Sequence, residues 1–200
     1  MVGTVEGPGS PGDVAEDREG PQILAFDEIR PRNWALVGGK GGHLAVMSRD
    51  PLLRVPEGFV ITAKTYHDLI NHNGLRAQLS EFERLMADRN AVAEELEAVR
   101  LSLEQGILAA AAPPGFLDNL SKVLQNLPQT EEPLFLAVRS SAQEEDMDFS
   151  WAGQFRSVLN VPAQTEAVFA AACEVMASLF SVGAIAYWRR FLPDENRMAI

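Results

Sequence analysis

A run of glycines around one lysine is the first segment of this sequence suited to anion chemistry. Gly38-Gly39-Lys40-Gly41-Gly42 lies between an apolar segment and a predicted helix. Free backbone amides and the positive end of a helix bind anions, and Lys40 adds a point charge. Trp34 occupies the first glycine position of a Walker A loop, and Gly41 stands where Ser or Thr should follow the lysine. Leu44 replaces the last glycine of a dinucleotide turn, so the run alone fits either a phosphate loop or a flexible turn.

A second cationic segment follows an apolar strand candidate. Residues 134–138 are apolar and predict a buried strand, and Arg139-Ser140-Ser141-Ala142 continues from its end. A guanidinium at that position can hold two phosphate oxygens at once, with two hydroxyl groups beside it. An arginine at the end of a strand is also often solvated or ion-paired, so this segment by itself leaves both interpretations open.

The next polar stretch offers a metal site or a loop, and then a flap. Glu144-Glu145-Asp146 is interpreted mainly as a loop, because three adjacent acids cannot all face one ion, and Asp148 adds little. Ser150-Trp151-Ala152-Gly153-Gln154 combines small residues with an aromatic ring. A glycine in such a segment lets the backbone approach a ligand closely, although a turn that enters a strand has the same composition.

The remaining reactive residue types favour structural roles. His43, His67 and His72 lack the spacing of a helical metal pair, and no cysteine or carboxylate completes a ligand set with them. Cys173 lies on an apolar helical stripe beside Met176, so it is interpreted as a small core residue. Ser140 and Ser141 lack the Gly-x-Ser-x-Gly pattern of a hydrolase. We therefore predict no metal site and no nucleophilic catalysis from these residues.

Alternating strands and helical blocks must position the cationic segments. Residues 23–26, 59–62, 134–139 and 155–161 predict strands, and residues 64–127 show a helical apolar period with breaks at Gly74 and Asn90. A helix with a wide apolar face is predicted around 168–180, and another over about 183–192. This order predicts an α/β or α+β fold, with a mixed sheet and a helical insertion.

Composition limits the partners. The 200 residues carry 17 Lys and Arg against 28 Asp and Glu, a formal charge of -11, which disfavours nucleic acid and anionic membranes. With 46% apolar residues the chain can build a core, yet no uninterrupted apolar stretch is long enough for a membrane span and no secretory signal is present. The single cysteine cannot form an intrachain disulfide, so a cytoplasmic location is predicted.

Residues 1–22 are rich in Gly and Pro and predict a disordered acidic leader, with one domain over 23–200.

Three motifs in order carry a family resemblance. Leu36-Val37-Gly38-Gly39-Lys40-Gly41, Val55-Pro56-Glu57-Gly58-Phe59-Val60-Ile61-Thr62 and the stretch from Ala137-Val138-Arg139-Ser140-Ser141-Ala142 to Ala152-Gly153-Gln154 resemble the N-terminal ATP-binding domain of the phosphoenolpyruvate synthase and pyruvate phosphate dikinase family. Ala177-Ser178-Leu179-Phe180 and Ala184-Ile185-Ala186-Tyr187 extend the resemblance, which covers about residues 23–200. Asp27-Glu28-Ile29-Arg30-Pro31 looks more like the rifampicin phosphotransferase branch.

The resemblance implies the N-terminal portion of an ATP-grasp-like nucleotide-binding domain. Its enzymes cleave ATP to AMP and phosphate and pass the β-phosphoryl group to a histidine on another domain, for transfer to pyruvate or another small molecule. By position, Lys40 and Arg139 match residues that neutralise the triphosphate, and Gly153 and Ser157 match the flap that covers it. Cations that stabilise spreading charge suit phosphoryl transfer.

Departures from the family pattern set the alternatives. The link Gln143-Glu144-Glu145-Asp146-Met147-Asp148-Phe149 is one residue shorter than in the family, and Ser157 replaces a threonine but keeps the hydroxyl. The sequence ends at Ile200, before the family's second lobe with its magnesium-binding Glu and Gln, and before the histidine and acceptor domains. We therefore expect ATP with Mg²⁺ as cofactor, metal ligands outside this chain, and no catalysis by these residues alone. The alternatives are a fragment of a rifampicin phosphotransferase-type antibiotic kinase and a noncatalytic binding module.

Overall fold

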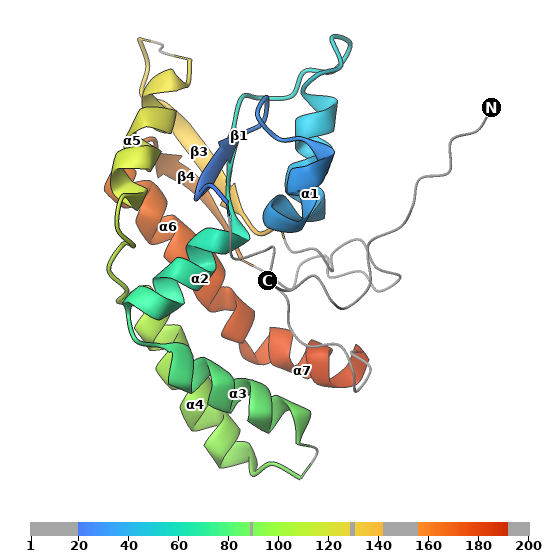
Figure 1. Cartoon of the computed structure of the whole chain (residues 1–200), viewed down its shortest axis with the longest axis vertical. Coiled ribbons are helices and arrows are strands. Elements are labelled where there is room, and N and C mark those ends of the chain that lie inside the picture. Colours follow the sequence, from blue (N-terminus) through green and yellow to red (C-terminus); the bar gives the residue numbers. More distant parts are fainter. Residues whose placement is uncertain (1–19, 89, 129–130, 142–155, 192–200) are drawn as a thin grey trace, which may run out of the picture.

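The computed structural model describes residues 20–88, 90–128, 131–141 and 156–191, without the side chains of 187–191. These residues form helices and short strands, as expected for an α+β protein (Figure 1). Most of the predicted leader, residues 1–19, lies outside the described part. Gln22 is held in place, because its carbonyl accepts a hydrogen bond from the Thr65 hydroxyl at 2.7 Å.

The first sheet has two antiparallel strands, and a kinked helix packs beside it. β1 (Ile23–Ala25) pairs with β2 (Phe59–Ile61), and a 3-10 turn, η2 (Pro31–Asn33), leads into α1 (Trp34–Met47). Gly38 interrupts α1 with φ 65° and ψ 171°, so α1 consists of two helical pieces. The expected loop before the helix is therefore one non-helical residue, and the rest of the glycine run belongs to the second piece.

Four helices fill the region predicted as helical. They are α2 (Ala63–His72), α3 (Arg76–Ala87), α4 (Ala93–Leu108) and α5 (Phe116–Asn126). Gly74, with φ 66°, separates α2 from α3, and Gly115, with φ 75°, precedes α5. Positive φ favours glycine, so these residues end and start helices where the sequence predicted breaks. The apolar period of the sequence indicates the three helices α3, α4 and α5, and the structure adds α2 before them.

The second sheet is also antiparallel and two-stranded. β3 (Phe135–Arg139) pairs with β4 (Ser157–Pro162), with an irregularity between Leu136 and Val138 where β4 has an additional residue. Asn160 has φ 56°, the left-handed conformation typical of a bulge. The mixed single sheet expected from the sequence is not formed by the described strands, which make two separate antiparallel pairs.

Both β2 and β3 are less buried than predicted. Every residue of β2 is only half-buried, and in β3 exposed and half-buried residues alternate, with Phe135 55% exposed. The sequence predicted buried strands from continuous apolar residues. That prediction is wrong for these residues because both strands line a cavity, so part of their surface has no packed neighbour among the described residues.

A long helical segment links the sheets to the helices. α6 (Thr165–Ala177) packs on β3, β4, α4 and α5, and η4 (Ser178–Phe180) joins it to α7 (Val182–Phe191). Thr165–Ala186 is the one described segment long and apolar enough to cross a membrane, and 56% of its most apolar window is buried. Such burial is typical of the core helix of a globular protein.

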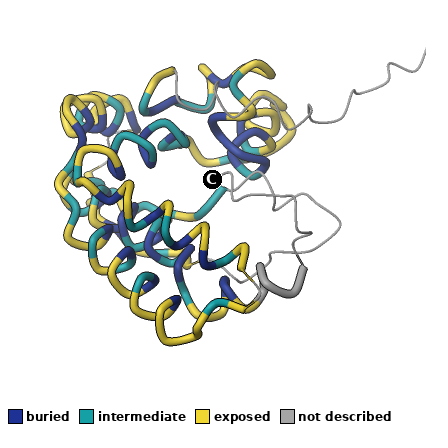
Figure 2. The backbone as a smooth tube through the Cα atoms, turned by 60° about the horizontal axis from the view of Figure 1, so that its bottom comes forward, coloured by how far each residue is buried: buried dark blue, intermediate teal, exposed yellow. Residues whose placement is uncertain are grey.

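Three clusters of buried side chains form the core. The largest joins α2, α3 and α4 to the end of α6 and includes Phe82 and Phe180, whose rings meet edge to face at 5.2 Å. A second lies between α5, α6 and the sheets around Phe116. The third packs β1 against α1 through Leu24, Val37 and neighbours. Figure 2 shows the buried residues on the inner sides of the helices and along the glycine segment of α1.

Candidate functional site

The glycine segment of α1 is bound directly to the residues that follow β3. The Ser141 hydroxyl donates a hydrogen bond to the Val37 carbonyl at 2.7 Å and accepts one from the Gly41 amide at 2.7 Å. These two bonds span the kink at Gly38. Ser141 therefore holds both helical pieces of α1 against the end of β3, a role that sequence reasoning missed because it noted Ser141 only as a hydroxyl group beside Arg139.

Close backbone approach explains the glycine at the kink. A Cβ atom on Gly38 would lie 1.7 Å from the carbonyl oxygen of Ser141, and φ there is positive. A Cβ on Gly41 would lie 2.9 Å from a methyl carbon of Val60. Because no side chain fits at Gly38, the glycine segment can meet the end of β3 only with this residue type.

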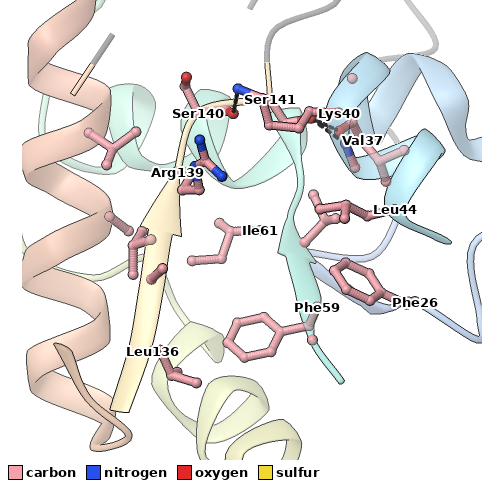
Figure 3. A pocket seen from close by; sticks show the side chains of 18 of the residues that line it. Phe26, Val37, Lys40, Leu44, Phe59, Ile61, Leu136, Arg139, Ser140 and Ser141 are labelled. Carbon is pink, nitrogen blue, oxygen red and sulfur yellow. Dashed lines mark hydrogen bonds between the residues drawn. The ribbon is translucent and has the colours of Figure 1, made fainter. Parts of the chain in front are cut away.

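Lys40 and Arg139 line the same cavity, although they are far apart in the sequence. The Lys40 amine donates to the Ser140 carbonyl at 3.0 Å, which places it beside the end of β3 (Figure 3). Arg139 is exposed, and its guanidinium makes no ion pair within the described part of the chain. The two predicted cations thus lie at one end of the cavity, together with Ser140 and Ser141.

Ser157 lies directly across the ladder from Arg139. The register of β3 and β4 pairs these two residues, and directly opposite residues of an antiparallel pair project to the same face of the sheet. Ser157 is exposed. Gly153, the other predicted flap residue, lies outside the described residues, as do Glu144-Glu145-Asp146 and Asp148.

The cavity has a volume of about 820 Å³, and most of the residues that line it are apolar, although Glu57, Thr62 and Tyr66 also contribute to its wall. Its walls come from β2, β3, α1 and α6, and Figure 3 shows Phe26, Phe59 and Ile61 around the space. Pockets for small molecules have volumes of roughly 300–1,000 Å³ and few polar groups. The arrangement can therefore hold an anionic head at the Lys40 end and apolar groups farther in.

Two of the three histidines pack on aromatic rings, His72 is exposed at the end of α2, and the cysteine is buried. His43 packs edge to face on Trp34 at 5.6 Å, and His67 packs on Tyr66 at 5.7 Å. Cys173 is buried, and burial raises the pKa of its thiol to about 11, so it is a poor nucleophile. In the described residues, no group of three or more His, Cys, Asp or Glu side chains could hold a metal ion.

The fold and the cavity together define a class: an α+β domain in which a glycine-rich helix start meets a cationic strand end. Comparison with known proteins gives the family. Residues 34–200 match the family described as "Pyruvate phosphate dikinase, AMP/ATP-binding domain", and the chain belongs to this family. The predicted resemblance is confirmed.

Individual relatives come from two kinds of enzyme. The chain is 35% identical to a rifampicin phosphotransferase from Streptomyces sviceus over 89% of its length, which is 20% of that protein. It is 31% identical to a phosphoenolpyruvate synthase from Aquifex aeolicus over 94% of its length, 22% of that protein. A rifampicin phosphotransferase from Bacillus subtilis is 34% identical over 82% of the chain and 18% of the relative. The chain thus spans about a fifth of the length of these curated relatives.

Proposed function

We propose that this chain binds the phosphates of ATP at the cationic end of the cavity. Lys40 and Arg139 neutralise the triphosphate, and Gly153 and Ser157 belong to a flap that covers it. The observation that carries the proposal is the meeting of two cations, 99 residues apart in sequence, beside a glycine-lined helix start in an AMP/ATP-binding domain family. The fold class proposed for the complete nucleotide domain is ATP-grasp-like.

Each residue has a distinct task in this proposal. Arg139 offers a planar fork of donors that matches two phosphate oxygens, whereas Lys40 supplies a compact charge that can leave the Ser140 carbonyl for a ligand. The second piece of α1 adds the positive end of its dipole. Ser141 is already committed to Val37 and Gly41, so it positions the glycine segment instead of contacting the ligand.

We assign the domain to an ATP-dependent phosphotransferase that cleaves ATP to AMP and phosphate. The β-phosphoryl group passes to a carrier histidine on another domain and then to pyruvate or another small molecule. Relatives named phosphoenolpyruvate synthase and rifampicin phosphotransferase support the reaction class. Because some relatives are named rifampicin phosphotransferase, an antibiotic is the alternative phosphoryl acceptor. A buried lone cysteine fits a reducing compartment such as the cytoplasm.

ATP is expected to bind together with Mg²⁺. The described acids form no cluster able to hold the ion by themselves, so the metal ligands are expected outside these residues. When bound, Mg²⁺ would shield the charge of the phosphates. In this proposal the chain itself contributes Lys40, Arg139, the backbone amides of the glycine segment and the flap residues Gly153 and Ser157.

Calorimetric titration of the chain with Mg-ATP tests the proposal, with inorganic triphosphate as a second ligand. We expect saturable binding of both, weakened by about tenfold or more in Lys40→Ala and in Arg139→Ala. Lys122→Ala is the matched control, because it removes the same charge from an exposed position of α5 outside the cavity. Absence of saturable heat, or equal loss in the control, would overturn the phosphate site.

A further inference from the structure

The cavity separates two strands, each of which has an open edge. All of β2 and all of β3 line it, whereas no residue of β1 or β4 does. Since β2 pairs only with β1 and β3 only with β4 among the described strands, the cavity lies between the two unpaired edges. Figure 3 shows β2 and β3 on opposite sides of the space.

Hydrogen bonding identifies the β2 backbone groups that face the open edge. The Phe26 amide donates to the Gly58 carbonyl, and the Thr62 amide donates to the Gln22 carbonyl. Main-chain groups alternate in direction along a strand, so Val60 also faces β1. The amides and carbonyls of Phe59 and Ile61 consequently point away from β1, toward the other edge.

The same reasoning applies to β3. The Ala163 amide donates to the Leu134 carbonyl, so Leu136 and Val138, at even steps along β3, face β4. The main-chain groups of Phe135, Ala137 and Arg139 point to the open edge.

We infer that an additional β-strand occupies this cavity. The strand would be supplied by the part of the polypeptide that follows the matched region in the longer relatives. Such a strand would pair with β2 on one edge and with β3 on the other. It would join the two antiparallel pairs into one five-stranded sheet. Its side chains on one face would pack on Val168, Ala172 and Val175 of α6, which form part of the cavity wall.

Two observations favour a strand over other occupants. Main-chain groups without a strand partner among the described residues run along two sides of the cavity. Lys40 and Arg139 lie at only one end, so most of the space suits a backbone. A strand inserted between two edges needs both of its own edges free, and every described strand already has a partner. A strand from a second copy of these residues therefore cannot occupy the cavity. The longer relatives have enough additional chain to supply one, because about four-fifths of each lies outside the matched region.

Amide hydrogen exchange, measured without nucleotide, tests whether an additional strand occupies the cavity. The chain is compared with a version extended after Ile200 by the segment that follows the matched region in the Streptomyces sviceus relative, about 20 residues, enough for a strand of five or six residues and a linker. We expect the amides of Phe59, Ile61, Phe135 and Ala137 to exchange quickly in the chain and at least tenfold more slowly in the extended version. Val60, Leu136 and Val138 should be protected in both.

Two variants make the outcome specific. A scrambled extension should leave the four edge amides unprotected, and so should Ala137→Pro in the extended chain, because proline removes a donor that faces only the open edge. Protection of the four amides in the unextended chain would mean that the edges pair with each other or with a second copy, and would overturn the inference. So would fast exchange in the extended chain. Neither result depends on ATP, so failure here is distinct from failure of the phosphate site.

Discussion

The helical part and the strand part of this molecule are packed to different degrees. In the helical part, Phe82, Leu103 and Phe180 are fully buried in one continuous cluster. In the strand part, β2 and β3 are half-exposed, and a cavity of about 820 Å³ lies between them. Regions that bind ligands or partners are commonly the less stable parts of a fold. The helices therefore contain the most completely packed core, and the proposed binding site lies beside the less packed strands.

The arginines show the same contrast. The Arg100 side chain of α4 is 8% exposed and is held by Glu97, Glu104 and the Phe180 carbonyl, so it secures η4 to α4. Arg139 is exposed at the end of β3, beside the cavity. Arg100 is held by ion pairs and a hydrogen bond, whereas Arg139 forms no ion pair with the described residues and is the proposed ligand of an anion.

The largest expected difference comes from truncating one apolar residue in each part. Phe180→Ala should lower the free energy of unfolding by about 3–5 kcal/mol, because it leaves a void against Phe82 in a fully packed cluster. Leu136→Ala in the cavity wall should cost only about 1–2 kcal/mol, because its side chain is half-buried. Urea denaturation of both variants measures this. Equal losses would contradict the comparison.

The next effect concerns two glycines with nearly identical backbone angles. Gly74→Ala should cost about 1 kcal/mol, since φ is 66° but no atom lies within 4 Å of the added Cβ. At Gly38 φ is 65°, and an added Cβ would also clash with the Ser141 carbonyl. Gly38→Ala should therefore lower the free energy of unfolding by about 3 kcal/mol. Thermal or urea unfolding gives the two losses. If they were alike, the contact between α1 and the end of β3 would not constrain the fold.

Some of this site could be predicted from sequence and some could not. Motif order predicted Lys40 and Arg139, because each lies beside apolar residues with a clear strand or helix pattern. Their meeting depends on Ser141 and on the absence of a Cβ at Gly38, which no local pattern reveals. The bulge at Asn160 sets Ser157 opposite Arg139, and its position is fixed only by strand pairing.

The exposure of the strands could not be predicted for a similar reason. Continuous apolar residues in 134–138 indicate a strand that is buried in its complete environment. In the described part of the chain β3 lines a cavity instead, so the observed burial is lower. The helices were more predictable, because their apolar stripes are satisfied by contacts among neighbouring segments, as in α3 and α4.

Exchanging the two arginines for alanine should produce opposite phenotypes. Arg100→Ala should lower the free energy of unfolding by about 2 kcal/mol, because Glu97 and Glu104 lose their partner and the Phe180 carbonyl loses a donor. Arg139→Ala should leave unfolding nearly unchanged but weaken Mg-ATP binding by about tenfold or more, equivalent to about 1.4 kcal/mol. Denaturation and calorimetry on both variants test this. Weaker binding in Arg100→Ala at full folding would break the division of roles.

The smallest effect is a pH dependence confined to the helical core. Burial raises the pKa of the Cys173 thiol from 9.0 to about 11, so between these values the unfolded chain loses a proton that the folded chain keeps. Stability is therefore fully present below pH 9 and should fall as pH rises, by about 1.4 kcal/mol per unit at most. Cys173→Ala should remove this slope between pH 8.5 and 10, before Tyr66, whose pKa burial also raises, contributes strongly. Urea midpoints across that pH interval measure it, and the same slope in both proteins would mean that the thiol is not sealed in the core.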